Sequence, residues 1–331
     1  MHRLPYSLPK YLLSVACALG ALSPLAAQQA TMVRMQRLAC HYSPADGELV
    51  LVMMSMSDQT HPQRSFQFRY EMEVVLEVDA ERRTHVENKN LKVAVIGDMV
   101  REIDRQYKLF RFSLAMDESS SIDDQSLREA REAISKFFTR LPVAYEAQII
   151  RFTNVPEVLT GFTNDPEVLL AALNRPRAGG GTAFYDAIDQ AMTELQQSGD
   201  GVPLQFIVAF TDGQDTTSGR FADFEQFRSK VEMVTRREQM PVFLAGIGAE
   251  VNHQLLERLA GNIGLYLPLK SLGDLDRLFE AVTNAVQKTY VIGIPVSSSL
   301  RGVKTVFIKR RTGEGHYDTL QDVPLPPECI P

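Results

Sequence analysis

The chain has 331 residues, of which 44% are hydrophobic and 23% are charged, a balance typical of one or two globular domains. Its formal net charge is −6 and its pI is near 5.6. Because nucleic-acid affinity depends on a basic face that neutralises phosphates, this charge argues against a nucleic-acid partner.

The first 27 residues have the pattern of a secretory signal peptide. Arg3 and Lys10 supply a positive start, residues 11–22 are mostly apolar, and small residues follow up to Ala27. We expect cleavage near Ala27, which would leave no membrane span and give a secreted, periplasmic or cell-surface protein. An uncleaved anchor is the alternative, although the apolar stretch is short for a span of about 20 residues.

Three cysteines are present in the chain. Cys17 lies inside the predicted signal, so the mature chain keeps Cys40 and Cys329, near its two ends. An even pair in an exported protein indicates a disulfide, which would tie the N-terminal segment to the C-terminal one. Two thiols that never meet are the alternative.

Strand patterns lie on both sides of a central region. Residues 28–47 are polar without a clear period, whereas residues 47–57 are apolar enough for a buried strand. From residue 64 to residue 78, apolar side chains alternate with mostly polar ones, which is typical of a half-exposed antiparallel strand. Further short strands are expected at residues 91–96, 290–295 and 303–308. We expect residues 48–96 and 290–310 to pair into one β-sandwich-like unit.

In the central region, strands and helices alternate. Strands are expected at residues 110–116, 145–152, 155–162, 203–210, 241–247 and 265–269, and helices at residues 123–141, 165–173, 183–197, 221–237, 252–259 and 275–287. This alternation predicts an α/β fold with a doubly wound, mostly parallel sheet and helices on both faces.

The most informative stretch is the end of the first central strand. It reads Asp117-Glu-Ser119-Ser-Ser121 and comes just before a helical pattern, and ligands bind at this position in open α/β sheets. Side chains two residues apart in an extended segment share a face, so Asp117, Ser119 and Ser121 can point at one centre. Such oxygen ligands suit Mg²⁺ or Mn²⁺ better than zinc. Alternatively, this is an ordinary loop in which Ser121 or Asp123 caps the helix.

Two further motifs occupy similar places, where a strand or loop leads into a helix. They are Gly179-Gly180-Gly181-Thr182 and Thr211-Asp212-Gly213. Together the three motifs resemble the metal-ion-dependent adhesion site (MIDAS) of the von Willebrand factor A (VWA) family, which includes the integrin I domains. That pattern is Asp-x-Ser-x-Ser, then a Thr after a glycine-rich loop, then an Asp followed by Gly. The resemblance covers roughly residues 107–287.

The resemblance implies a VWA-type fold and a site for Mg²⁺ or Mn²⁺. It implies Ser119 and Ser121 as direct ligands, Thr182 as a ligand in one state, and Asp117 and Asp212 as direct or water-mediated ligands. Two carboxylates would balance the charge of the cation, and an open coordination position could take an Asp or Glu carboxylate of a partner protein. The three glycines would let Thr182 approach without strain.

Four acidic residues lie near the motifs. Asp123 and Asp124 resemble a second cation site of some integrin subunits, but their spacing is one residue short, so helix capping is the preferred interpretation. We expect Glu118 and Asp215 to shape the rim of the site.

Four segments are therefore predicted. They are a signal peptide at residues 1–27, an N-terminal β-rich segment at 28–104, a VWA domain at 105–288, and a C-terminal β segment at 289–331 that pairs with the N-terminal one. The two flanks loosely resemble those of bacterial secreted VWA-related proteins.

No enzyme is predicted. Ser119 and Ser121 are not in a Gly-x-Ser-x-Gly motif, and the six histidines form no zinc-binding pattern. A phosphatase-like site would have a second aspartate where Ser119 stands. We predict a secreted, metal-dependent protein-binding or adhesion module. The alternatives are a structural subunit of an envelope assembly, in which the metal only stabilises the fold, and a metal-assisted hydrolase.

Overall fold

A computed structural model of the chain describes residues 33–44, 47–57, 72–79, 81–95, 109–141, 143–176, 179–198, 204–261, 264–296, 302–313 and 316–329. All of them belong to one compact unit that spans residues 32–331. The predicted signal peptide and the alternating residues 64–71 lie outside the described residues. Among the residues that the structure describes, no helix is both long enough and apolar enough to cross a membrane.

The α/β part of the chain is built on a six-stranded sheet of order β11–β10–β9–β6–β7–β8. Its strands are β6 (Leu109–Asp117), β7 (Ala144–Phe152), β8 (Pro156–Thr163), β9 (Leu204–Thr211), β10 (Val242–Ile247) and β11 (Leu265–Leu269). Neighbouring strands are parallel except for β7 and β8. The chain runs outward from β6 to β7 and β8, then returns to β9 on the other side of β6. This topological switch point is where open α/β sheets bind ligands.

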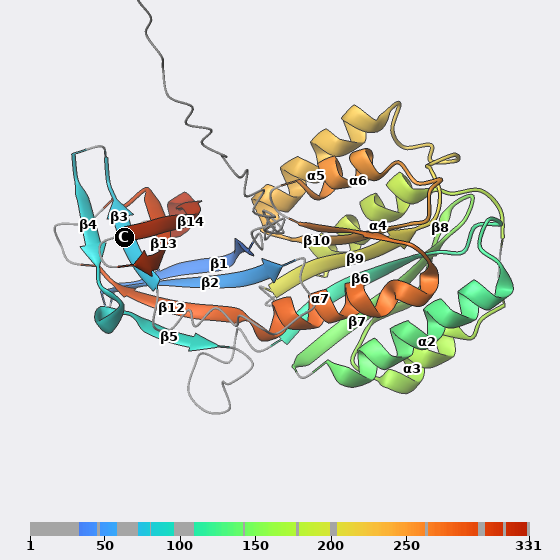
Figure 1. Ribbon diagram of the computed structural model, residues 1–331, viewed down its shortest axis with the longest axis horizontal. Helices are drawn as coiled ribbons and strands as arrows, with labels where there is room; N and C mark the ends of the chain where they lie inside the picture. The colour runs from blue at the N-terminus through green and yellow to red at the C-terminus, as the bar shows by residue number, and fades with distance from the viewer. Residues whose placement is uncertain are drawn as a thin grey trace, which may run out of the picture. The chain divides into compact units, whose positions relative to one another are not determined.

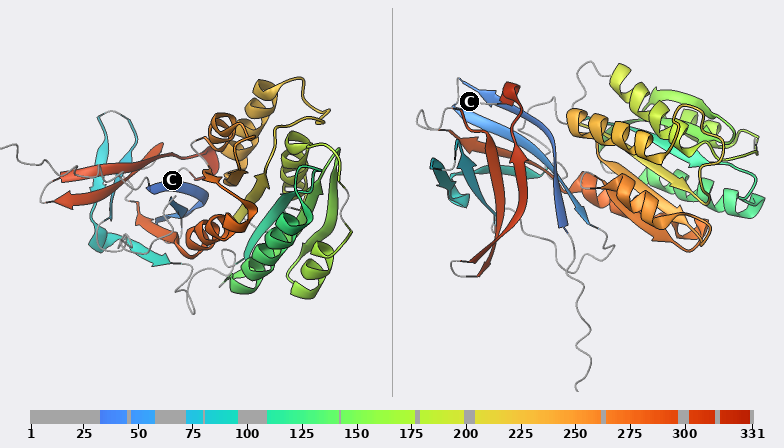
Figure 2. Two further views of the ribbon diagram at one scale, coloured as in Figure 1. Left: turned by 45° about the vertical axis from the view of Figure 1, so that its right-hand side comes forward. Right: turned by 90° about the horizontal axis from the view of Figure 1, so that it is seen from above.

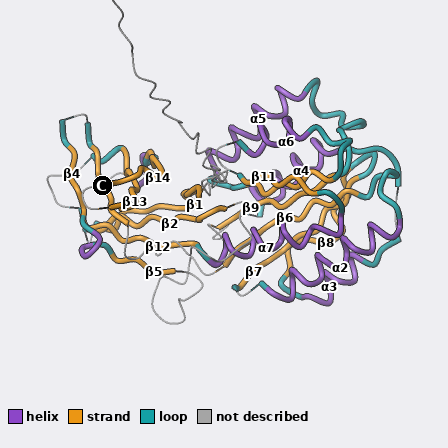
Figure 3. Tube along the Cα trace, in the orientation of Figure 1, coloured by secondary structure: helices purple, strands orange, loops and turns teal. Residues whose placement is uncertain are grey.

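Helices cover both faces of this sheet (Figures 1 and 3). One face carries α2 (Asp124–Arg140), α3 (Pro166–Leu173), the 3-10 turn η5 (Leu272–Asp274) and α7 (Leu275–Gln287). The other carries α4 (Phe184–Gln197), α5 (Phe224–Glu238) and α6 (His253–Ala260). Alternation along β6 explains the two cores, because Phe112 and Leu114 pack on the first face and Ala115 on the second.

Strands from both ends of the chain form a β-sandwich of two four-stranded sheets (Figure 2). One sheet has the order β1 (Val33–Ser43), β2 (Glu48–Ser57), β12 (Thr289–Pro295), β5 (Lys92–Val95), and the other has the order β14 (His316–Pro324), β13 (Thr305–Gly313), β3 (Met72–Glu77), β4 (Arg83–Val86). Two 3-10 turns, η2 (Asn88–Asn90) and η7 (Pro327–Cys329), complete the described elements. Residues of both sheets, such as Leu51 and Val306, share one apolar cluster.

The predicted fold class is confirmed, including the β-rich unit built from the N- and C-terminal segments. In that unit β12 pairs antiparallel with β2 and β5, and β13 pairs antiparallel with β3. The predicted limits of the four segments remain predictions.

Strand β2 is buried on both of its faces. Leu49, Leu51 and Met53 belong to the sandwich core, whereas the intervening Val52 and Met54 belong to the core beneath α7. Alternation in a strand sends successive side chains to opposite faces, so a continuous apolar run of this kind serves two cores at once. The run therefore joins the sandwich to the α/β part of the chain.

Strand β1 was not predicted, because residues 28–47 show no period of two. The structure explains this, since the pairing of β1 with β2 shifts between Arg37 and Ala39. At the bulge Leu38 and the adjacent Ala39 both lie against the α/β core, while Met35 before it and Cys40 after it both lie against the sandwich core. Strands β4 and β14 were also not predicted, and three of the four residues of β4 are exposed.

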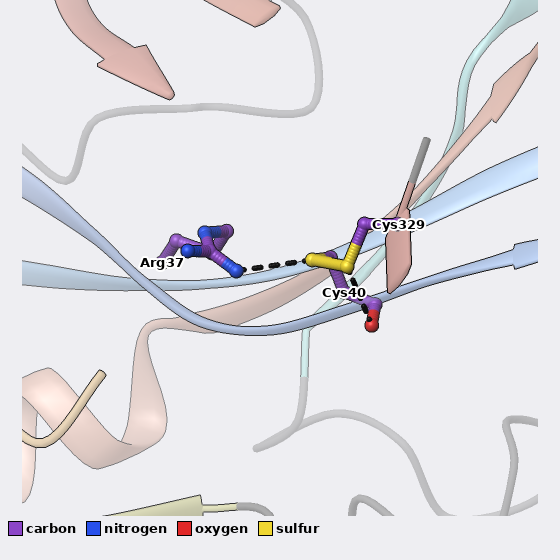
Figure 4. The surroundings of a disulfide bond; sticks show 3 residues. All are labelled: Arg37, Cys40 and Cys329. Carbon is purple, nitrogen blue, oxygen red and sulfur yellow. Dashed lines mark hydrogen bonds between the residues drawn. A yellow bond between two sulfur atoms is a disulfide. The ribbon is translucent and has the colours of Figure 1, made fainter. Parts of the chain in front are cut away.

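The structure joins Cys40 of β1 to Cys329 of η7 by a disulfide, as predicted (Figure 4). The two Cα atoms are 5.8 Å apart, within the usual range for this bond. Arg37 Nη1 donates a hydrogen bond of 3.0 Å to Cys40 Sγ. The disulfide links the first sheet to the turn that follows the last strand of the second sheet.

Candidate metal centre

The first loop of the candidate site follows β6, a central strand that pairs with β7 on one side and β9 on the other. Asp117 ends β6 and is fully buried, and Ser119 is 1% exposed. The backbone N–H of Ser119 donates to Asp117 Oδ1 at 2.8 Å, which folds the loop back on itself. As a result Ser119 Oγ lies 2.9 Å from Ser121 Oγ, so the three predicted ligands gather on one side of the loop.

The third loop begins at Asp212, directly after β9. Ser121 Oγ donates a hydrogen bond of 2.8 Å to Asp212 Oδ1, which joins this loop to the first. The neighbouring Thr211 Oγ1 donates to Asp117 Oδ2 at 2.6 Å. Each of the two carboxylates thus accepts a hydrogen bond from a hydroxyl group of the opposite loop or strand end, Asp117 from Thr211 and Asp212 from Ser121.

The second loop contributes Thr182, which is 5% exposed. Its Oγ1 lies 3.5 Å from the point that a Cβ would occupy on Gly213, beside Asp212. Its backbone is paired in both directions with Thr216, because Thr182 N–H donates to Thr216 Oγ1 at 3.0 Å and Thr216 N–H donates to Thr182 O at 2.9 Å. The structure therefore brings all five predicted residues to one place.

The glycines before Thr182 are needed for this approach. Gly180 has φ +125°, and a Cβ there would lie 2.8 Å from Asn154 Nδ2, while a Cβ on Gly181 would lie 2.5 Å from Thr217 Cγ2. Gly180 N–H donates to Ser120 Oγ at 2.8 Å, and Ser120 N–H donates to Gly180 O at 2.9 Å. A Cβ at either position would displace Asn154 or Thr217, so this part of the second loop needs glycine.

Burial dominates the electrostatics of the site. It raises the pKa of Asp117 to about 6, against the lowering effect of the hydrogen bonds from Thr211 and Ser119, and the charge of Asp212 raises it further. A nearby positive charge, such as that of a bound cation, would favour the ionised form of this carboxylate. A divalent cation fits this donor set, because two carboxylates balance its charge and three hydroxyl oxygens complete a set of hard ligands.

Clusters of three or more His, Cys, Asp or Glu side chains able to hold a metal ion are absent from the described part of the chain. The five-residue site is of a different kind, since it has two carboxylates and three hydroxyls. The nitrogen and sulfur ligands that are usual for zinc take no part in it.

Two predictions about nearby acidic residues can be assessed. Asp123 is the N-cap of α2, where its Oδ1 accepts hydrogen bonds of 2.8 Å from the N–H groups of Gln125 and Ser126, so the preferred capping interpretation is confirmed. The expected place of Glu118 on the rim is wrong, because its side chain is only 1% exposed. Asp215 accepts from Tyr185 N–H at 2.8 Å and so ties the third loop to α4.

Four residues that support the site were not predicted. Thr211 holds Asp117, Ser120 holds Gly180, Asn154 Oδ1 accepts from Gly181 N–H at 2.7 Å, and Thr216 holds Thr182. Thr211 and Ser120 lie inside the motifs, so their hydroxyl groups were available as a signal. Asn154 and Thr216 gave none, because their partners are 27 and 34 residues away in sequence.

Comparison with known families agrees with the fold. The profile of the von Willebrand factor type A domain matches residues 113–281, just over half of the 331 residues. The chain belongs to this family. VWA domains are generally non-enzymatic modules that bind protein ligands, and those with a MIDAS bind divalent metals.

Several solved structures are similar to this chain. Proximal thread matrix protein 1 from the mussel byssus, solved with a zinc-occupied MIDAS motif, is 16% identical with a TM-score of 0.47, and the match covers 62% of this chain and 50% of that one. A von Willebrand factor type A protein from Catenulispora acidiphila is 11% identical with a TM-score of 0.49 over 89% and 72%. The corresponding domain of the pilus tip protein Mfa5 from Porphyromonas gingivalis is 10% identical with a TM-score of 0.46 over 54% and 95%.

This chain thus spans half the length of the mussel protein. A search of curated proteins finds no match to the chain.

Proposed function

We propose that this chain is a secreted or envelope-associated protein-binding module that docks an acidic residue of a partner protein on a bound Mg²⁺ or Mn²⁺ ion. The ligands would be Asp117, Ser119, Ser121, Thr182 and Asp212. When bound, the ion supplies a positive charge with an open coordination position. The observation that carries the proposal is the convergence of these five side chains from three separate loops at the switch point of the sheet.

The candidate ligands differ in exposure, and this difference indicates the side from which a partner could reach a bound cation. Asp117, Ser119 and Thr182 are buried, whereas Ser121 is exposed. A cation held by the buried oxygens would therefore be covered by the protein on one side and open to solvent on the side of Ser121. A carboxylate from another protein can approach from that open side.

The exposed side chains next to the candidate ligands are mostly neutral, and the exposed charged ones nearest to them in sequence are the acidic Asp123 and Asp124. Ser120, Asn154, Gln214, Thr216 and Thr217 are all exposed and neutral. Attraction for an acidic partner would then come from the cation itself, because none of these side chains can form an ion pair. Binding that depends on the ion in this way should disappear when a chelator removes it.

The proposed location has separate support. Disulfides persist in oxidising compartments, and the bond between Cys40 and Cys329 suits an exported protein, in line with the predicted signal. We assign no catalytic role to the serines of the site. Ser121 Oγ donates to Asp212 and Ser119 Oγ lies against Ser121 Oγ, an arrangement that suits ligands of a cation.

The first test measures thermal unfolding in Mg²⁺, Mn²⁺, Zn²⁺ and EDTA. A ligand that binds only the native state stabilises it, by about 2.7 kcal/mol at 100 times the dissociation constant. We expect Mg²⁺ and Mn²⁺ to raise the melting temperature of the wild type and not that of Asp117→Ala. Asp124→Ala is the matched control, because it removes an acidic residue at the start of α2 outside the ligand set. An unchanged wild-type melting temperature in both metals would refute the metal site.

The second test addresses the partner. Water proton relaxation reports the water molecules on bound Mn²⁺, and acetate serves as the simplest carboxylate probe. We expect acetate to lower the relaxation enhancement by displacing metal-bound water. If metal stabilises the protein but neither acetate nor glutarate displaces water, the docking role fails and the metal is structural. Stabilisation by Zn²⁺ alone would overturn the choice of metal.

A further inference from the structure

Glu118 is a buried carboxylate that the metal site does not use. It follows Asp117 directly in the first loop, yet its side chain is 1% exposed and turns toward the side where α2 and β7 lie. Its backbone N–H donates to Phe152 O at 3.0 Å, which anchors the loop to the end of β7. A buried carboxylate costs free energy unless it is paired, so the partners of Glu118 need an explanation.

Two arginines meet this carboxylate. Arg131 of α2 donates from Nη2 to Glu118 Oε1 at 2.8 Å, and Arg151 of β7 brings Nη1 to 3.6 Å from Oε2. Oε2 accepts no hydrogen bond within the described part of the chain, so the carboxylate is only partly satisfied. An ion pair with an unsatisfied oxygen is a poor way to stabilise a fold, because well-packed apolar residues are often as stable. Its geometry is therefore more informative than its energy.

Both arginines also reach the start of the second loop. Arg131 Nη2 donates to Arg175 O at 3.0 Å, and Arg151 Nη1 donates to Pro176 O at 2.7 Å. These carbonyl groups lie a few residues before the glycines and Thr182. Each guanidinium thus touches Glu118 in the first loop and a backbone carbonyl in the second. Arginine suits this role, because its planar group presents several donors in fixed directions.

We propose that Glu118 is a positioning residue of the metal site, which acts through Arg131 and Arg151 to set the distance between the loop of Asp117 and the loop of Thr182. The inference rests on the proposed metal-dependent function. Thr182 is the one predicted ligand that comes from the second loop, so its distance to the other ligands depends on how the two loops are held together. Residues that orient metal ligands from outside typically change metal affinity about 10–100-fold when they are replaced.

A matched ion pair lies elsewhere on the same two strands. Arg111 of β6 and Glu146 of β7 are partly buried, with Arg111 Nη2 2.6 Å from Glu146 Oε2, and the two residues are register partners near the opposite ends of their strands. Glu146→Gln therefore breaks a comparable link between β6 and β7 without touching either metal loop.

The experiment compares the wild type with Glu118→Gln, Arg131→Lys and Glu146→Gln. Mn²⁺ affinity is measured by titration with detection of free Mn²⁺ by electron paramagnetic resonance, and the metal-free melting temperature is recorded for each protein. Arg131→Lys keeps the positive charge but loses the planar group that reaches both Glu118 and Arg175 O. We expect Glu118→Gln and Arg131→Lys to raise the Mn²⁺ dissociation constant about tenfold or more, and Glu146→Gln to leave it within twofold.

Each other result overturns the inference. Wild-type affinity in Arg131→Lys would mean that only charge matters, and equal weakening in Glu146→Gln would mean that general destabilisation is responsible. If Glu118→Gln does not fold, the milder Arg131→Lys still decides between these outcomes. A wild type without Mn²⁺ affinity would refute the proposed function itself. Wild-type affinity in both Glu118→Gln and Arg131→Lys would refute only the role of Glu118.

Discussion

The α/β part and the β-sandwich bury their cores by different routes. The α/β part uses one continuous stretch from β6 to α7, in which each parallel strand except β7, which leads into β8, is followed by a helix. The sandwich takes β1 to β5 from before that stretch and β12 to β14 from after it, so three of its six strand pairs (β2 with β12, β12 with β5, and β13 with β3) join segments far apart in sequence. The first route depends on local order, and the second depends on the two ends of the chain meeting.

The two regions also differ in how their cores are filled. Stacked aromatic side chains occupy the α/β core, where the ring centroids of Phe112 and Phe206 are 4.7 Å apart. The sandwich core consists mainly of aliphatic residues and methionine, and a disulfide joins its two sheets' ends. Strand β2 belongs to both regions. The three loops of the candidate metal site therefore belong to the α/β part, whose helix α7 packs against β2, a strand of the sandwich.

The largest expected effect comes from β2, where adjacent methionines point into different cores. Met53 lies in the sandwich core and Met54 in the α/β core, and both are fully buried. Truncation of either to alanine should lower the free energy of unfolding by about 2–5 kcal/mol, because each change leaves a cavity. Denaturant titration measures the free energy of unfolding. Hydrogen exchange should show that protection is lost first in α7 for Met54→Ala and first in β13 for Met53→Ala.

A single unfolding transition in both variants would mean that β2 couples the two regions. Two separate transitions in the wild type would contradict this coupling and make the regions independent. Val168→Ala is a suitable control, since this side chain is exposed on α3.

Removal of the disulfide should have a smaller effect on stability, and we expect that effect only in the sandwich. Replacement of both Cys40 and Cys329 by serine removes a bond across 289 residues of sequence without leaving a lone thiol. Loss of a native disulfide typically costs about 2–4 kcal/mol of stability. We expect the lost protection to appear in β1 and β14, with Mn²⁺ affinity unchanged. Weaker Mn²⁺ binding in the double variant would contradict this and would show that the sandwich influences the loops of the candidate metal site.

The α/β part could be predicted from its sequence because its signals are local. Asp123, Asp165 and Asn252 each mark a helix start and each caps that helix. The sandwich was harder to predict. The bulge in β1 removes its period, and β4 is mostly exposed, so neither shows a pattern of apolar residues.

The same difference between local and distant signals applies to the candidate site. Its five candidate ligands could be predicted, because their types and spacing lie within short motifs. The inward direction of Glu118 could not be predicted, because it depends on arginines supplied by α2 and β7. The supporting role of Asn154 depends in the same way on the folded position of a distant glycine.

The smallest predicted effect concerns a local feature beside the site. Asp123→Ala removes the N-cap of α2, and Asp165→Ala removes the equivalent cap of α3, away from the metal loops. Each should lower the melting temperature by about 2–4 °C, because one helix end loses the acceptor for its first N–H groups. Since Asp123 already accepts from two backbone groups, we expect the Mn²⁺ affinity and stoichiometry to stay the same in both variants. Loss of a second Mn²⁺ equivalent in Asp123→Ala alone would revive the second-cation interpretation and would mean that this residue serves the site directly. An unchanged stoichiometry would mean that Asp123 acts only as the cap of α2.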